Sequence, residues 1–216
     1  MTEAESDSDY SWTPGDGRAP SSRRGHRTRE RILEAAVAVF EERGLVEVTV
    51  QEIGQRAGVS SGTVYKYFRD KADIFRFLLM ELRRTIAEET TIALDDDGKL
   101  IVWPAMSRFL ELYRANVALY RVWWESLDPP TEFSDMWVEV HEGYRKGFAA
   151  ALRRGKRTGV TRPDLDVELA AELAVLLFER PIYSRIVLRW DPDGEDDQVT
   201  DVTAALLGTG LGSVTR

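Results

Sequence analysis

A pentapeptide near residue 60 has a spacing that fits two kinds of chemistry. Gly58-Val59-Ser60-Ser61-Gly62 matches the G-x-S-x-G pattern, in which a sharp turn between a strand and a helix exposes a nucleophilic serine. Within the longer run AGVSSGTVYKYFRDK (57–71), the same residues fit the turn and second helix of a helix-turn-helix. The elements around Ser60 decide between these alternatives.

The residues before Ser60 do not favour a hydrolase. A nucleophile elbow follows a strand, whereas VQEIGQRA (50–57) has helical spacing. The chain has two histidines, His26 and His141, and only His141 follows the serine as such a hydrolase requires. A serine hydrolase that uses Ser60 is therefore the disfavoured alternative, and we expect no catalytic residue and no enzyme.

The helix-turn-helix accounts for more of the residues. Ala57 is small enough for two helices to cross closely, and Gly58 can adopt the left-handed conformation of a tight turn. The Ser60 hydroxyl can cap the next helix, on which Val64 and Phe68 would face the core. The side chains left on the exposed face are hydroxyls, a cation and two phenols, which suit base edges and phosphates: Thr63, Tyr65, Lys66 and Tyr67.

Helical patterns surround this motif and predict an all-α fold of about nine helices. An apolar face begins after Thr28 and is closed by Gly44, and Thr49 and Glu52 have the spacing of a capping box. Asp70 is expected to begin a longer helix that extends to about Thr91. Further amphipathic segments span about 99–115, 117–127, 132–157, 167–189 and 198–211, with no convincing strand.

Composition bounds the function. The 216 residues include no cysteine and carry a net charge of −8, yet residues 23–84 hold 13 Lys+Arg against 9 Asp+Glu. This basic third suits contact with phosphate. No metal site is expected, because the acidic cluster 191–197 lacks the spacing of a calcium loop. The chain shows no membrane span and no signal peptide, so we expect a cytoplasmic protein without cofactor.

The runs TRERILEAAVAVFEERG (28–44) and TVQEIGQRAGVSSGTVYKYFRDKADIF (49–75) resemble the DNA-binding domain of TetR-family transcriptional regulators. The matching run covers about a quarter of the chain and departs from the usual pattern only in small changes, at Val64 and Tyr67. The resemblance implies a homodimeric regulator, a repressor more often than an activator, that binds a palindromic double-stranded DNA operator. Four segments are expected: a disordered tail and basic arm (1–27), the helix-turn-helix domain (28–70), a connecting helix (71–92) and, as the resemblance implies, a ligand-binding and dimerisation domain (93–216). The tail, 1–22, is predicted from its richness in Ser, Asp, Gly and Pro without periodicity.

The resemblance assigns DNA contacts to matching positions. Base or phosphate contacts are expected from Thr49, Gln51, Ser60, Ser61, Gly62, Thr63, Tyr65, Lys66, Tyr67 and Lys71. Arg23, Arg24 and Arg27 either reach a minor groove or stay mobile.

The second half of the chain is rich in aromatic residues, and an aromatic stripe at helical spacing forms either a core or a pocket. His141 interrupts the stripe, as a satisfied core residue or as a ligand contact. The resemblance implies a pocket for an aromatic or hydrophobic effector, with these candidates: Trp103, Met106, Phe109, Leu110, Tyr113, Tyr120, Trp123, Trp124, Trp137, His141, Tyr144 and Phe178. A regulator without an effector is the alternative.

The last two apolar segments need a partner surface. They form either part of the core or, as the resemblance implies, a four-helix dimer interface that contains Leu173, Leu176, Leu177, Ile182, Ile186, Ala204, Ala205 and Gly208. Pro181 is expected to kink or break the first segment, because proline removes a helical hydrogen bond.

Overall fold

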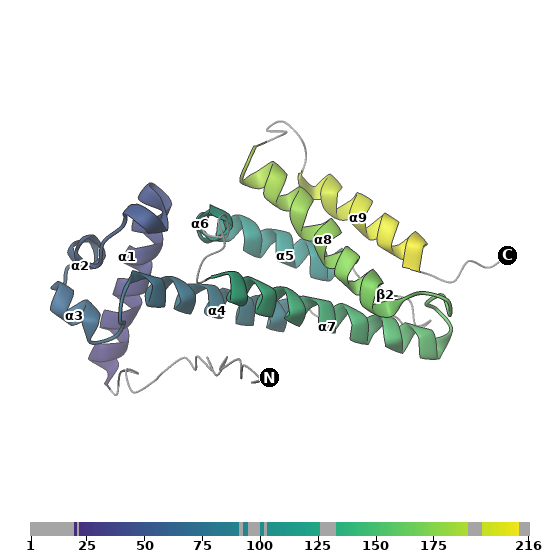
Figure 1. The fold of residues 1–216 in the computed structure, drawn as a ribbon, viewed down its shortest axis with the longest axis horizontal. Coiled ribbons are helices and arrows are strands. Elements are labelled where there is room, and N and C mark those ends of the chain that lie inside the picture. Colours follow the sequence, from purple (N-terminus) through teal and green to yellow (C-terminus); the bar gives the residue numbers. More distant parts are fainter. Residues whose placement is uncertain are drawn as a thin grey trace, which may run out of the picture. The chain divides into compact units, whose positions relative to one another are not determined.

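The described part of the protein, seen in a computed structural model, comprises residues 20, 22–90, 93–94, 100–101, 103–125, 133–189 and 196–211. Nine helices and one short hairpin lie within these residues, which confirms the all-α fold (Figure 1). The helices are α1 (Arg23–Glu47), α2 (Val50–Ala57), α3 (Ser61–Tyr65), α4 (Lys71–Glu89), α5 (Trp103–Ala115), α6 (Val117–Glu125), α7 (Ser134–Thr158), α8 (Val167–Ile186) and α9 (Asp196–Leu211).

The hairpin was not expected from the sequence. Strands β1 (Ala93–Leu94) and β2 (Leu100–Ile101) pair antiparallel, Ala93 with Ile101 and Leu94 with Leu100. Two residues per strand are too few for an alternating pattern to be recognised. Residues 95–99, between the two strands, lie outside the described residues.

Contacts divide the chain into two compact units, Met1–Phe77 (unit 1) and Leu78–Arg216 (unit 2). The division falls within α4, inside the segment 71–92 that was expected to connect two domains.

In unit 1, α1 begins earlier than predicted. The basic residues from Arg23 to Arg27 are helical, not an irregular arm, because the Ser22 hydroxyl accepts a hydrogen bond from the Gly25 N–H (3.1 Å) and caps the helix. At the other end Gly44 has φ 72°, so the regular helix stops where the sequence predicted. The expected tail, 1–22, lies almost wholly outside the described residues.

The turn of the helix-turn-helix has the predicted local structure. Thr49 and Glu52 form a complete capping box at the start of α2, and Gly58 ends that helix with φ 66°. The Ser60 side chain accepts a hydrogen bond from the Thr63 N–H (3.2 Å) at the start of α3. The segment before the turn is helical, so Ser60 lacks the preceding strand that a nucleophile elbow needs.

A shared apolar core fixes α3 against the other helices of unit 1. Val64 and Phe68 are buried as predicted, and Phe40 of α1 meets Phe75 of α4 edge to face at 5.7 Å between ring centres. The Arg29 guanidinium lies 4.0 Å from the ring centre of Phe77. Burial on one side of α3 leaves its opposite side to face outward.

In unit 2 the long helices α7 and α8 pack together (Figure 1). Gly159 ends α7 with φ 79°, close to the expected end of the segment 132–157. Pro181 does not break the next segment: α8 continues to Ile186 with the proline inside it.

The substitution of glycine by alanine is expected to have opposite effects on stability at two positions of α7. A Cβ at Gly155 would collide with the buried side chain of Thr161, whereas a Cβ at Gly147 would meet no atom within 4 Å. We expect Gly155→Ala to lower the free energy of unfolding by about 1–3 kcal/mol through overpacking. Gly147→Ala should raise it by up to about 1 kcal/mol, since alanine favours the helix. Urea titration measures both, and equal stabilities would contradict the close packing of Thr161.

Candidate DNA-binding helix and ligand cavity

The outward face of α3 presents a phenol and a cation. Tyr65 is 52% exposed and Lys66 is exposed, while Thr63 and Ser61 are half-buried beside them. Gly62 adds no side chain, and its nearest neighbour to a Cβ position is the Ser60 hydroxyl at 3.8 Å. This face leaves room for a flat surface such as a base edge or a sugar-phosphate backbone.

Three predicted contact residues are already hydrogen-bonded within unit 1. The Thr49 hydroxyl donates to the Glu52 carboxylate (2.8 Å), which holds the pKa of that carboxyl below its usual value. The Lys71 ammonium donates to the Val46 carbonyl (2.6 Å), and the Ser60 hydroxyl caps α3. These hydrogen bonds stabilise the helix-turn-helix itself, and contact of the three side chains with DNA stays a prediction.

The start of α1 lies beside the end of α3. A Cβ at Gly25 would lie 3.5 Å from the Tyr67 hydroxyl, so the exposed Arg23, Arg24 and Arg27 are on a helix adjacent to the candidate recognition helix. Gln51 is exposed on the first turn of α2. The positive charge predicted for this region therefore borders α3.

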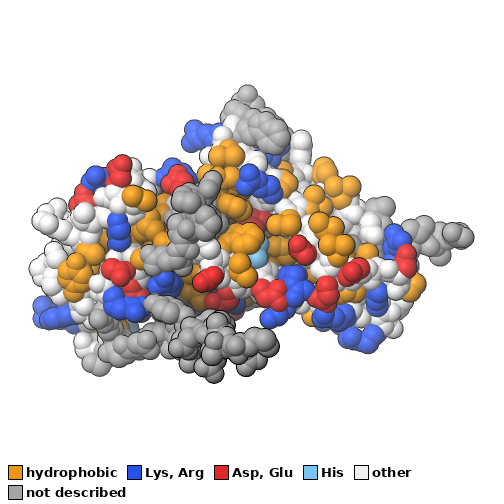
Figure 2. Space-filling view, viewed as in Figure 1, with side chains coloured by type: hydrophobic (Ala, Val, Ile, Leu, Met, Phe, Trp, Pro, Cys, Tyr) orange, Lys and Arg blue, Asp and Glu red, His pale blue; other side chains and the backbone are white. Residues whose placement is uncertain are grey.

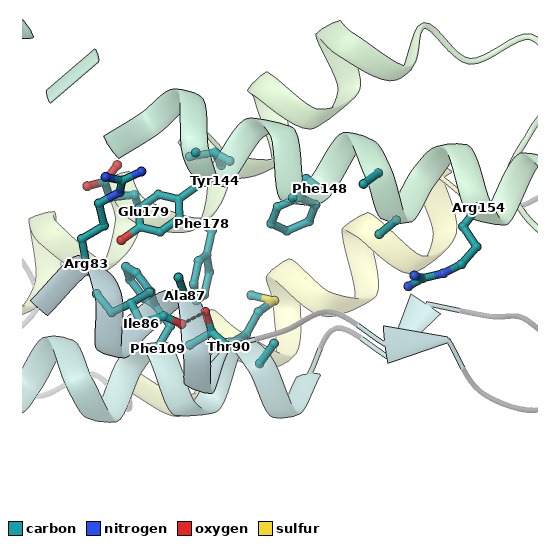
Figure 3. A pocket seen from close by; sticks show the side chains of 17 residues that line it. Arg83, Ile86, Ala87, Thr90, Phe109, Tyr144, Phe148, Arg154, Phe178 and Glu179 are labelled. Carbon is teal, nitrogen blue, oxygen red and sulfur yellow. Dashed lines mark hydrogen bonds between the residues drawn. The ribbon is translucent and has the colours of Figure 1, made fainter. Parts of the chain in front are cut away.

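Unit 2 contains an elongated cavity of about 450 Å³ between α4, α5, α7 and α8. Figure 3 shows Arg83, Tyr144 and Glu179 toward one end, Arg154 at the other, and phenylalanine rings between them. Of the twelve predicted pocket residues, four line this cavity: Met106, Phe109, Tyr144 and Phe178.

Most of the cavity wall was not predicted from the sequence. The missed residues are Arg83, Ile86, Ala87 and Thr90 of α4, Ala105 of α5, Gly143, Gly147, Phe148, Ala150, Ala151 and Arg154 of α7, and Val175 and Glu179 of α8. Many of them are small. Glycine and alanine recurring every three or four residues along α7 were the signal that could have located a hollow face.

The other predicted pocket residues do not line this cavity. Tyr113 and Tyr120 are 0% and 2% exposed and stack at 3.7 Å between ring centres, and burial raises the pKa of both phenols. Trp103 lies at the surface and donates from Nε1 to Asp201 of α9 (2.7 Å). Leu110 and Trp123 are buried, Trp124 packs against Tyr183, and Trp137 stacks on His141.

His141 is a satisfied core histidine. It is 9% exposed, its Nδ1 lies 2.9 Å from the Trp137 carbonyl, and its Nε2 hydrogen-bonds to the Glu179 carboxylate. Glu179 is 5% exposed and lines the cavity. The histidine therefore acts behind the cavity wall by fixing an acidic side chain that faces the cavity.

An apolar surface runs along α8 and continues onto α9. Leu169, Leu173, Leu176 and Leu177 are between 40% and 55% exposed, and with Leu206 they line a groove of about 710 Å³. Figure 2 shows hydrophobic side chains on the surface over these helices.

Two of the α8 residues predicted for a dimer interface do not line this groove. Ile182 is 1% exposed and belongs to the core of unit 2, because it follows Leu173 by nine residues, or about two and a half helical turns, and so faces the opposite side of α8. Ile186 is half-buried on the same side as Ile182. On α9, Ala205 is exposed, Ala204 is half-buried, and Gly208 lies within the helix.

Among the described residues, no group of three or more His, Cys, Asp or Glu is placed to hold a metal ion. The acidic segment 191–195 lies outside them. No helix in the described ranges is long and apolar enough to span a membrane.

The structure combines an N-terminal helix-turn-helix with a larger, mainly helical unit. Residues 32–77 match the tetR family of bacterial regulatory proteins. The transcriptional repressor KstR2 of Mycobacterium tuberculosis is 30% identical over 203 residues, covering 91% of this chain and 94% of the relative. The chain therefore belongs to the TetR family of transcriptional regulators.

Solved structures share the fold. The complex of SmeT with triclosan is similar with a TM-score of 0.69 and 22% identity, covering 83% of this chain and 90% of that one. The fatty acid degradation regulator FadR from Bacillus halodurans has a TM-score of 0.65 and 22% identity, covering 84% and 94%.

Proposed function

We propose that this TetR-family protein represses transcription by binding a palindromic operator as a homodimer, and that a small molecule in the unit 2 cavity releases it. The observation that carries the DNA-binding part is the outward face of α3, where Tyr65 and the adjacent C-cap residue Lys66 are exposed. A buried core and two caps hold this helix in place. KstR2 of Mycobacterium tuberculosis is a transcriptional repressor, which supports repression. Such a protein acts in the cytoplasm, where the DNA is.

The homodimer is supported by the apolar groove on α8 and α9. Exposed leucines in a continuous strip are unfavourable in water, and a second copy of the strip would bury them in an isologous contact. In a dimer two α3 helices enter successive major grooves, about 34 Å apart.

The effector is supported by the cavity itself. Its volume of about 450 Å³ lies within the range of pockets for drug-sized ligands, and its middle is apolar. These features favour a ligand sensor over a regulator without an effector. SmeT, a relative by fold, has been solved with triclosan.

A population shift would couple the two sites. The cavity is lined in part by α4, and that helix continues from unit 2 into unit 1. A ligand that favours one position of α4 needs only about 1–3 kcal/mol of coupling to change operator affinity by about 5–150-fold.

Operator selection from random DNA, followed by fluorescence anisotropy at two salt concentrations, tests this function. We expect a palindromic consensus that Lys66→Ala binds about ten-fold or more weakly with relaxed specificity, because a base contact is lost. Tyr65→Ala should weaken binding uniformly across sequences. The control is Lys146→Ala, an exposed lysine of unit 2 with the same change of charge. If no consensus emerges, or if Lys66→Ala and Tyr65→Ala both bind like the wild type and the control, α3 does not recognise DNA.

A further inference from the structure

One end of the cavity combines side chains of opposite charge. Arg83 and Glu179 both line it, and Figure 3 shows them toward the same end with the Tyr144 ring. The rest of the wall between this end and Arg154 consists largely of aliphatic and phenylalanine side chains. A ligand with an apolar body along this wall can therefore place a polar group at the Arg83 end, where it meets a cation and a carboxylate together.

The Glu179 carboxylate is held in place from behind. His141 binds its Oε2, and Glu179, which is 5% exposed, lines the cavity, so this carboxylate supplies a hydrogen-bond acceptor to the cavity wall. A buried carboxylate attracts a hydrogen-bond donor and repels an anion placed close to it.

Arg83 is fixed less firmly. Its Nη1 donates to Glu139 of α7 (2.9 Å), whose side chain is 59% exposed, and exposed ion pairs of this kind are weak. The guanidinium lies over Gly143, where a Cβ would be 3.4 Å from Nη2. Arg83 has five N–H donors, so it can donate to a ligand oxygen while it repels a ligand cation.

A neutral hydroxyl satisfies both groups, because it donates one hydrogen bond and accepts another. A ligand carboxylate would meet Glu179, and a ligand ammonium would meet Arg83. The cavity volume of about 450 Å³ corresponds to about 15 non-hydrogen atoms at roughly 30 Å³ each.

We propose that the effector is an amphipathic molecule of about this size with one neutral hydroxyl, which lies between Glu179 of α8 and Arg83 of α4. The inference rests on the proposed effector site and names its ligand class. The bound hydroxyl joins α8 to α4, and this contact gives the ligand a preference for one position of α4.

The probe is 4-heptylphenol, and its methyl ether and 4-heptylbenzoate are the comparison compounds. Titration calorimetry in the absence of DNA measures the affinity of the protein for each. The ether keeps the oxygen but lacks the donor, and the benzoate adds a charge. We expect the wild type to bind the phenol at least ten-fold more tightly than either analogue, since a site built to bind a hydroxyl disfavours a ligand that lacks it.

Variants assign the contacts. Glu179→Gln keeps the size of the side chain, and it should narrow the preference for the phenol over the ether and strengthen benzoate binding. Arg83→Met should weaken binding of the phenol about ten-fold or more. The control is Arg84→Met, which should leave this affinity unchanged, because Arg84 is exposed and paired with Glu81 and Glu88. Gly147→Leu should abolish binding of all three compounds by filling the cavity.

Equal affinities for phenol and ether, tighter binding of the benzoate, or no binding of the phenol to the wild type would each overturn the proposal. So would an Arg83→Met variant that binds the phenol like the wild type. Because the titration contains no DNA, these results are independent of whether the protein recognises an operator.

Discussion

A Leu173→Glu variant is expected to be a monomer that has lost operator binding. Leu173 is 55% exposed and lines the apolar groove on α8 and α9, and an isologous dimer would bury it twice. Each buried leucine contributes roughly 2 kcal/mol, so two substitutions weaken the dimer by about 4 kcal/mol, or about a thousand-fold. Light scattering measures the mass, and anisotropy on the selected operator measures the affinity.

The matched control is Val138→Glu. Val138 is 58% exposed on α7 and lies outside the groove, so the same charge should leave both mass and affinity unchanged. A dimeric Leu173→Glu protein with normal operator affinity would show that the groove is not the dimer interface. A stable monomer that still binds the palindrome would instead show that dimerisation is not needed for recognition.

His141→Leu is expected to cause a large loss of stability. The change removes the hydrogen bond to Glu179 and leaves a carboxylate that is only 5% exposed without that partner. Breaking a buried pair in this way costs about 3 kcal/mol, which corresponds to a fall in Tm on the order of 10 °C for a chain of this size. Calorimetry at one fixed pH measures the shift.

The double variant His141→Leu/Glu179→Leu distinguishes the contribution of the His141–Glu179 interaction from a simple loss of packing. It should be more stable than His141→Leu alone, because both members of the pair are then apolar. His26→Leu is the control, since that histidine is exposed on α1. The single variant Glu179→Leu completes the comparison. If the stability losses of the two single variants sum to the loss in the double variant, the pair contributes no coupling energy.

The caps and the turn of the helix-turn-helix could be predicted from the sequence alone. The capping box of Thr49 and Glu52, the left-handed Gly58 and the cap at Ser60 each involve residues within three positions of one another. Interactions of this range depend on backbone geometry and side-chain type, so the pattern of residues predicts them without knowledge of the tertiary fold. The order of helices followed from apolar periodicity in the same way.

Only the tertiary structure decided which apolar residues face a cavity, a core or the surface. Phe109 lines the cavity, whereas Tyr113, one turn later on α5, stacks on Tyr120 of the neighbouring helix. On α8, Leu173 is exposed and Ile182 is buried. Periodicity identifies the apolar face of a helix but not its neighbours. Whether such a face meets a void, a ring or solvent depends on helices distant in the sequence, such as α4 and α8, which bring Arg83 and Glu179 to one cavity.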